Sequence, residues 1–205
     1  MMRRTIAVVS AGLRQPSSTR MLADRLADAA RRELEQLGAE VDVEVIELRD
    51  HAHDLVNNLL AGYPSEELKR VHETVAGADA LIAVTPTFSA SFNGFFKMFV
   101  EVLDDTALVD KPVLVAATGG TGRHSLVLEH ALRPVFTYLH AVVVPTAVFA
   151  APEDWGAGDT AESSLVHRID RAAGELAREV DRRDKPTHTD PFDNPTPFAH
   201  LLGAE

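Results

Sequence analysis

Residues 5–20 read TIAVVSAGLRQPSSTR, and this stretch decides the fold class. Its first six residues form a short β-branched run, which is typical of a strand buried on both faces of a sheet. The run ends in small hydroxyl residues and one arginine. From Ser17 to Leu37 the apolar residues follow helical spacing, and Gly38 supplies a natural stop. The stretch therefore predicts a buried strand, a polar loop and an amphipathic helix, in that order.

The same alternation of short apolar runs and long amphipathic stretches continues along the chain. Further strands are expected at 41–48, 79–88, 111–120 and 141–150. Further helices are expected at 65–78, at 91–104, at 124–140 with an interruption near Pro134, and at 161–183, whereas 50–64 is ambiguous. Strands that alternate with helices predict an α/β fold, here a five-stranded parallel sheet with five helices on its two faces.

The length of the chain fits one such domain and no more. Its 205 residues, 45% hydrophobic and 25% charged, have an ordinary globular composition and can bury a sizeable core. We assign residues 1–184 to this domain. Residues 185–205 are rich in Pro, Asp and Thr and have no periodic apolar face, so we expect a tail, ordered at most against a partner subunit.

Charge and cysteine content exclude several classes of function. The formal net charge is −11, which argues against a general affinity for nucleic acids or anionic membranes. A small anionic ligand stays possible, because backbone amides at a helix start bind phosphate whatever the global charge. The chain has no cysteine, which excludes disulfides, thiolate metal sites and thiol nucleophiles. With no run of the ~20 apolar residues that a membrane span requires, we expect a soluble cytoplasmic protein.

Three of the predicted strands end in unusual polar loops. They read SAGLRQPSSTR at 10–20, TPTFSASFNG at 85–94 and ATGGTGRHS at 117–125. In an open parallel sheet, ligands bind outside the carboxyl ends of the strands. Because the three loops follow strands of one orientation, we expect them to converge on one edge and to form one site.

The first loop contains the kinds of groups that bind a phosphate. Hydroxyl groups and the free amides of the following helix would bind the anion, and a guanidinium would pair with it in a bidentate fork. It is neither a P-loop nor the G-x-G-x-x-G of a dinucleotide fold. The alternative is that Ser17 or Ser18 only caps the helix and Arg14 is solvated. The candidate residues are Ser10, Arg14, Ser17, Ser18 and Thr19.

The second loop supplies a flat apolar surface. Pro86 and Phe88 flank Thr87, and the hydroxyls of Thr87 and Ser89 are placed to bond the edge of a heterocycle. The alternative is an ordinary Pro-containing turn before a helix with buried phenylalanines. Because Phe88 precedes that helix, it is the best ligand candidate among the aromatic residues.

The third loop has three glycines within four positions, which allows the backbone to approach a ligand closely. The alternative is a flexible turn. Arg123 would contact the bound group, bind the phosphate of a nicotinamide nucleotide or be solvated, and the sequence does not separate these roles. The candidate residues are Thr118, Gly119, Gly120, Thr121, Gly122 and Arg123.

Together these loops resemble the NAD(P)H-dependent FMN reductase family of flavodoxin-like proteins, over about residues 4–150. SAGLRQPSST is similar to the family's SGSLRxxSxT phosphate loop, and TPTFSASFNGFFKMFVEVLD to its TPxYxxSxxGxxKxxxD flavin loop. LRPVFTYLHA at 132–141 is close to LRPVxxYLxA. Two departures, Ala11–Gly12 in place of Gly-Ser and Phe88 in place of Tyr, leave the FMN affinity open. Among members, the chain most resembles reductases that partner luciferase-like flavin monooxygenases.

The resemblance implies a flavodoxin-like three-layer sandwich that binds FMN in the three loops. Hydride would pass from NAD(P)H to flavin N5 and on to free FMN, a quinone or a partner monooxygenase, so no catalytic protein residue is expected. Backbone amides of 119–122 would stabilise negative charge at flavin N1 and C2=O. The resemblance also implies a homodimer or homotetramer, with contacts from 91–104 and the tail after Asp184.

Three alternatives to an FMN reductase remain open. On the same scaffold the chain could be an NAD(P)H:quinone or azo-dye reductase, or a non-enzymatic flavodoxin-like electron carrier. A regulatory module that binds a phosphorylated metabolite would use the first loop without a flavin. The sequence predicts no metal site, since His51 and His53 lie in a segment that looks exposed and have only Asp50 and Asp54 nearby.

Overall fold

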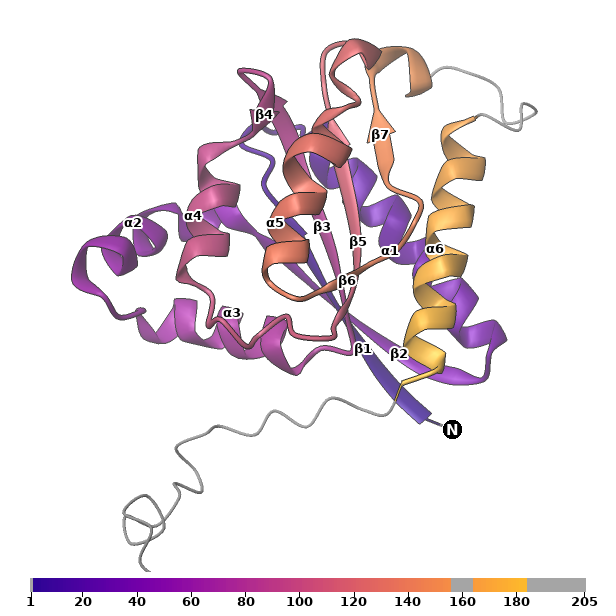
Figure 1. Cartoon of the computed structure of the whole chain (residues 1–205), viewed down its shortest axis with the longest axis horizontal. Coiled ribbons are helices and arrows are strands. Elements are labelled where there is room, and N and C mark those ends of the chain that lie inside the picture. The colour runs from indigo at the N-terminus through magenta and orange to yellow at the C-terminus, as the bar shows by residue number, and fades with distance from the viewer. Residues whose placement is uncertain (1, 156–163, 184–205) are drawn as a thin grey trace, which may run out of the picture.

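Parallel strands form the centre of the molecule, and the computed structural model describes them within residues 2–155 and 164–183. The strand order β2-β1-β3-β5-β6 is that of flavodoxin-like sheets (Figure 1). The α/β class, the parallel sheet and its helical cover are therefore confirmed. The parallel strands are β1 (Met2–Ser10), β2 (Ala39–Glu47), β3 (Ala80–Phe88), β5 (Pro112–Thr118), β6 (Val142–Val143) and β7 (Val148–Ala150).

The predicted number of five strands is wrong, because the sheet has seven. The single strand expected at 141–150 is divided into β6 and β7, which both pair with β5 on either side of the segment containing Pro145. The seventh strand, β4 (Ser91–Phe92), forms an antiparallel hairpin with the end of β3. Ser89 and Ala90 make its turn at positive φ, 48° and 67°, without the Asn-Gly pair that usually signals such a hairpin.

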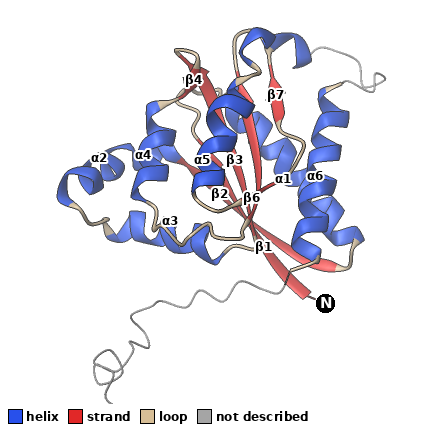
Figure 2. Cartoon of the chain, in the orientation of Figure 1, coloured by secondary structure: helices blue, strands red, loops and turns tan. Residues whose placement is uncertain are grey.

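Helices cover both faces of the sheet (Figure 2). One face carries α1 (Ser18–Gln36) and α6 (Leu165–Asp181), which pack against each other. The other face carries α3 (Glu66–Gly77), α4 (Gly94–Val102) and α5 (Arg133–Tyr138), and α2 (Ala52–Ala61) packs against α4. Residues 185–205, the predicted tail, lie outside the described residues. Within the described part of the chain, no helix has the length and apolar character needed to cross a membrane.

Two helical predictions need correction. The segment 124–140 is not one helix interrupted at Pro134: a π-helical turn, Leu128–Leu132, precedes α5, and Pro134 lies in the first turn of α5. A proline is tolerated there because the amides of the first turn lack helical partners. The ambiguous segment 50–64 contains the end of a 3₁₀ turn, Leu48–His51, and α2, so the described residues hold six α-helices rather than five.

Side chains of the sheet alternate between two apolar cores. Ile6 and Val8 of β1 face α1 and α6, whereas Ala7 and Val9 face the layer of α3, α4 and α5, and all four are fully buried. This alternation follows from the period of two along a strand. Because helices cover both faces of the central strands, the polar ends of these strands are where a ligand would reach them.

At the amino end of the sheet, buried charges pair with one another. Arg4 Nη1 donates to Asp79 Oδ1 at 2.8 Å, and the two side chains are 3% and 1% exposed. Asp79 also accepts from the Thr5 amide at 2.8 Å, and Arg4 Nη2 donates to the Arg183 carbonyl at 2.7 Å. Lys111 donates to the Ala76 carbonyl at 3.0 Å and to that of Ala78. Burial lowers the pKa of Lys111 to about 8, although the Asp79 carboxylate partly opposes the shift.

Candidate functional site

At the opposite, carboxyl end of the sheet, hydrogen bonds hold the three predicted loops together. The Ala11 amide donates to the Val84 carbonyl at 2.9 Å. Asn93 Nδ2, just after β4, donates to the Ala11 carbonyl at 2.6 Å. The hydroxyls of Thr19 and Thr118 lie 2.8 Å apart and are buried. The first loop is thus bonded to the second directly and to the third through α1 and β5, so the three loops converge on one edge as strand direction predicted.

The first loop is shaped by a close contact between Gly12 and Ser17. A Cβ on Gly12 would lie 2.1 Å from Ser17 Oγ, so the backbone approach requires glycine. Ser17 caps α1, because its Oγ accepts from the Arg20 amide at 3.2 Å. The capping interpretation therefore holds for Ser17. It leaves the next two amides, of Ser18 and Thr19, without a partner inside the helix.

The same loop has polar groups that face no protein partner. Ser10 Oγ is buried and, within the described residues, accepts or donates no hydrogen bond. Arg14 is exposed and, in that same part of the chain, pairs with no other residue. A buried hydroxyl without a partner is costly, so such a group in a folded protein points to a bound water or ligand. A guanidinium, a hydroxyl and helix N-terminal amides together suit a phosphate.

The second loop is the β3–β4 hairpin. Pro86 is buried in the strand, whereas Phe88, near the tip, is 48% exposed. Thr87 Oγ1 is buried and finds no hydrogen-bond partner among the described residues. Ser89 is exposed in the turn. The hairpin thus offers an apolar ring and one unused hydroxyl beside the first loop.

The third loop uses two of its amides within the protein. The Gly119 amide donates to the Ala150 carbonyl at 3.1 Å, and the Gly122 amide donates to Glu153 Oε1 at 3.2 Å. We expected the four backbone amides at 119–122 to face a ligand. With Gly119 and Gly122 bonded inside the protein, the amides of Gly120 and Thr121 remain as candidates. A Cβ on Gly120 would meet no atom within 4 Å, so this position is open. Arg123 is exposed beside it.

Sequence reasoning missed two residues that position these loops. Asn93 is buried, joins the first two loops and caps α4 by accepting from the Phe96 amide at 2.8 Å. The Asn-Gly pair directly before an apolar helical run was the signal that could have identified this cap. Glu153, whose carboxylate accepts from the Gly122 amide, follows β7. It lies far from Gly122 in the sequence, so no local pattern reveals the contact.

The sequence model of the NADPH-dependent FMN reductase family matches residues 4–156. The chain belongs to this family. It is 36% identical over 174 residues to the FMN reductase (NADPH) of Pseudomonas aeruginosa, covering 84% of this chain and 90% of that protein. It is 35% identical over 170 residues to the NADH-dependent FMN reductase SfnE of Pseudomonas putida, covering 82% and 88%. As a family member the chain is an enzyme, an oxidoreductase that uses NAD(P)H and FMN.

Solved structures share the fold of this chain. An oxidoreductase from Corynebacterium diphtheriae is 43% identical and has a TM-score of 0.86, over 90% of this chain and all of that one. The apo form of the NADH:FMN oxidoreductase EMOB is 23% identical and shares the fold, with a TM-score of 0.75 over 93% of this chain and 99% of that one.

The histidine pair His51 and His53 takes no part in this edge of the sheet. His51 is partly buried at the end of the 3₁₀ turn after β2, and its Nδ1 lies 3.9 Å from Glu67 Oε1. His53 is exposed on α2. Among residues 2–155 and 164–183, no group of three or more side chains is arranged to hold a metal ion.

Proposed function

We propose that FMN binds across the three loops with its 5′-phosphate in the first loop. One observation carries the proposal: the buried Ser10 hydroxyl, the unpaired Arg14 and the amides of Ser18 and Thr19 surround the start of α1 without protein partners among the described residues. Their charge and donor set match a phosphate monoester. The Gly12 contact keeps the loop free of a side chain that would fill this space.

The other two loops would hold the flavin ring. Phe88 and Pro86 would contact the ring, and the hydroxyls of Thr87 and Ser89 would bond its polar edge. The amides of Gly120 and Thr121 would stabilise negative charge on the pyrimidine side, because they are preorganised in a loop fixed by Glu153. Thr118 bonds to Thr19 and would act by holding the first and third loops in register.

Bound FMN would supply the redox chemistry by accepting a hydride from NAD(P)H, so the protein needs no nucleophile. What the chain contributes is orientation and charge. The β3–β4 hairpin and the glycine loop would orient the ring, and Arg123 at the rim would meet the nucleotide phosphate or the flavin edge. The final electron acceptor would be free FMN, a quinone or a partner flavin-dependent monooxygenase.

We also propose that the enzyme is a cytoplasmic homodimer or homotetramer. The absence of cysteine from all 205 residues fits a reducing compartment. A groove of about 460 Å³ lies between α4 and α5, and Tyr138 at its side is 82% exposed. An exposed aromatic beside an apolar groove is the kind of surface that a second copy covers. Sedimentation that shows a monomer at all concentrations would contradict this.

An absorbance spectrum followed by nucleotide titration tests the function. Wild-type protein should bind FMN and oxidise NADPH or NADH when FMN is present, and comparison of the two nucleotides gives the preference. Comparison of FMN, a quinone and an azo dye as acceptors separates the FMN reductase from its relatives on the same fold. A protein that binds no FMN and oxidises neither nucleotide with excess FMN would contradict the proposal.

A further inference from the structure

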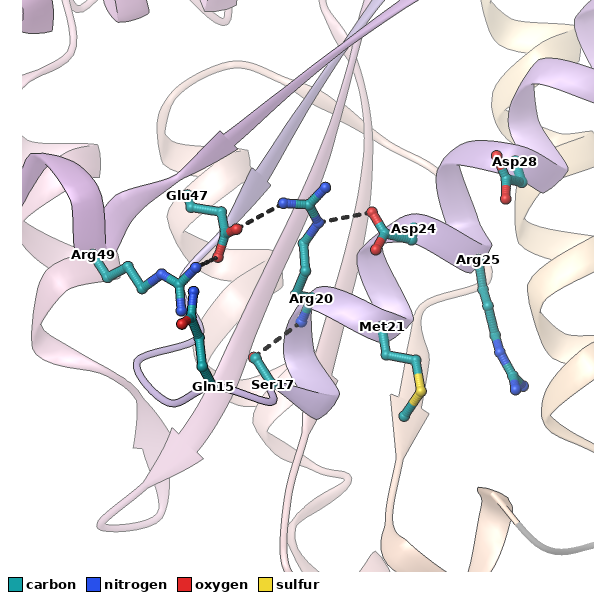
Figure 3. Close-up of a pocket in the computed structure, with 9 residues that line it drawn as sticks. All are labelled: Gln15, Ser17, Arg20, Met21, Asp24, Arg25, Asp28, Glu47 and Arg49. Carbon is teal, nitrogen blue, oxygen red and sulfur yellow. Dashed lines mark hydrogen bonds and ion pairs between the residues drawn. The ribbon is translucent and has the colours of Figure 1, made fainter.

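A network of charged side chains lies directly beside the first loop (Figure 3). Glu47 is its centre: Oε1 accepts from Arg20 Nη1 at 2.7 Å, and Oε2 lies 2.9 Å from Arg49 Nη2. The Arg20 Nε donates in addition to Asp24 Oδ1 at 2.8 Å. The same side chains line a pocket of about 370 Å³ on the outer side of α1.

Three elements meet at this carboxylate. Glu47 is the last residue of the edge strand β2, Arg20 lies in the first turn of α1, and Arg49 belongs to the 3₁₀ turn that follows β2. The Glu47 and Arg49 side chains are only 14% and 19% exposed, so solvent weakens their pairing less than that of a surface ion pair. The carboxylate thereby fixes the start of α1 relative to the sheet.

The network also reaches the phosphate loop itself. With the Gln15 amide in the orientation that matches donors to acceptors, Gln15 Oε1 accepts from Arg49 Nη1 at 2.9 Å and from Arg49 Nη2 at 2.6 Å. Gln15 follows Arg14, the unpaired cation of the loop, and precedes the Ser17 cap by two positions. Loop 11–17 is therefore held at one end by Asn93 and in its middle by Arg49.

Arg20 and Arg49 are poor candidates for direct phosphate ligands. Arg20 is bonded to two carboxylates, which raise its pKa, the Asp24 hydrogen bond most of all. Arg49 is committed to Glu47 and Gln15. A guanidinium whose donors already face carboxylates gains less from a further anion than one without partners. Their role is better explained by the geometry that they impose on the residues next to them.

We propose that Glu47, acting through Arg20 and Arg49, is a positioning residue for the phosphate loop and thereby raises the affinity of the protein for phosphorylated flavin. The inference rests on the proposed function, because it assigns the loop to the FMN phosphate. Glu47 itself does not touch the ligand. It holds the N-terminal turn of α1 and, through Arg49, the Gln15 side chain, so that Arg14, Ser18 and Thr19 can bind one anion.

Electrostatics alone predicts the opposite effect for this carboxylate. Removing a negative charge near the loop would attract a phosphate dianion more strongly, whereas loss of order in the loop would weaken binding. The attraction is screened over about 10 Å at 0.1 M salt and over a shorter distance at higher salt. Titration at about 0.3 M salt suppresses it and leaves the ordering effect, so the sign of the change in Kd separates the two.

The experiment titrates the full-length protein with FMN and with riboflavin, which lacks the phosphate, and follows flavin fluorescence. Glu47→Gln removes the carboxylate with little change of shape. Gln15→Met removes the loop's bond to Arg49 without changing any charge. Glu44→Gln is the matched control, because Glu44 is an exposed acid on the same strand and gives the same change in net charge. Urea unfolding midpoints show whether each variant is folded.

The expected result is that Glu47→Gln and Gln15→Met each raise the FMN Kd about three- to tenfold, as loss of one or two positioning hydrogen bonds would. The riboflavin Kd should stay unchanged, and Glu44→Gln should match wild type. The unfolding midpoint of Glu47→Gln should fall, because Arg20 and Arg49 lose a largely buried partner, but the variant should be fully folded in the absence of urea. An unchanged or lower FMN Kd, or an equal rise for riboflavin, would overturn the inference. Wild-type protein that binds neither flavin would overturn the proposed function and the inference with it.

Discussion

The two ends of the sheet differ in how completely their buried polar groups are paired. At the amino end, Arg4 and Asp79 are almost fully buried and bond to each other, and Lys111 is bonded to two backbone carbonyls. At the carboxyl end, Ser10 Oγ and Thr87 Oγ1 are buried with no partner among the described residues. Buried polar groups are normally satisfied, and these two exceptions belong to the strands that lead into the first two loops. Asn58 Oδ1 and His72 Nε2, which also lack partners among the described residues, lie in α2 and α3 and not at this edge.

The difference separates stability from binding. A buried ion pair affects stability most when one partner is removed, because the remaining charge is then buried without an opposite charge beside it. Unpartnered groups at the carboxyl end weaken the folded protein and become useful only when a ligand satisfies them. Substitutions at the amino end should therefore change unfolding, and those at the carboxyl end should change FMN affinity.

The largest effect is expected for Asp79→Asn. It leaves Arg4 charged and buried without a carboxylate, and should lower the free energy of unfolding by about 3–5 kcal/mol in urea titrations. Arg3→Gln, in the neighbouring exposed pair with Asp42, should give no measurable change. FMN affinity of the folded Asp79→Asn protein should equal that of wild type. A variant with normal stability and weakened FMN binding would break the comparison.

Arg14→Gln should act at the other end. Loss of a charge-assisted hydrogen bond worth about 1.5–3 kcal/mol should raise the FMN Kd about ten- to a hundredfold. Riboflavin affinity and the unfolding midpoint should not change, because Arg14 is exposed and pairs with no residue in the described part of the chain. Arg70→Gln, which removes an exposed arginine from α3, is the control. An equal loss of affinity for FMN and for riboflavin would show that Arg14 does not bind the phosphate.

The lowered pKa of Lys111 makes the stability of the folded protein depend on pH. Its pKa is about 8 in the folded protein and, once exposed by unfolding, returns to about 10.4. Between these values the unfolded chain holds a proton that the folded chain has released, so stability rises with pH. The unfolding free energy of wild type should therefore rise relative to that of Lys111→Met, by about 1 kcal/mol per pH unit from pH 8 to 10. A constant difference would mean that the buried lysine titrates normally.

The smallest effect is expected for Glu153→Ala, which removes the acceptor of the Gly122 amide in the third loop. The bond is exposed, so its loss should raise the FMN Kd only about two- to threefold. The same fluorescence titration measures it. A rise as large as that of Arg14→Gln would place the third loop, and not the first, at the centre of recognition.

Much of the fold could be predicted from local sequence. The apolar runs around Ile6 and Ile82 belong to buried strands, and the predicted boundaries of the first and third parallel strands lie close to Met2–Ser10 and Ala80–Phe88. The convergence of three polar strand ends followed from strand direction alone. The hairpin at Ser91–Phe92 was missed because Ser89 and Ala90, neither of them a typical turn pair, adopt positive φ in the tertiary context.

What could not be predicted depends on contacts distant in sequence. Arg4 and Asp79 are 75 positions apart, and Glu47 joins Arg20 across 27. No periodicity or motif signals such a pair. The candidate phosphate residues were found because they cluster in one loop, whereas the side chains that hold the loop in place come from other elements. The assignment of individual residues to FMN stays a prediction.

The dissociation constants of FMN and riboflavin from the wild-type protein decide whether the first loop recognises a phosphate. Both flavins share the ring, and only FMN carries the phosphate that the first loop should bind. FMN should bind at least about tenfold more tightly than riboflavin, in line with one charge-assisted contact from Arg14 and the helix amides. Equal dissociation constants for the two flavins would contradict it.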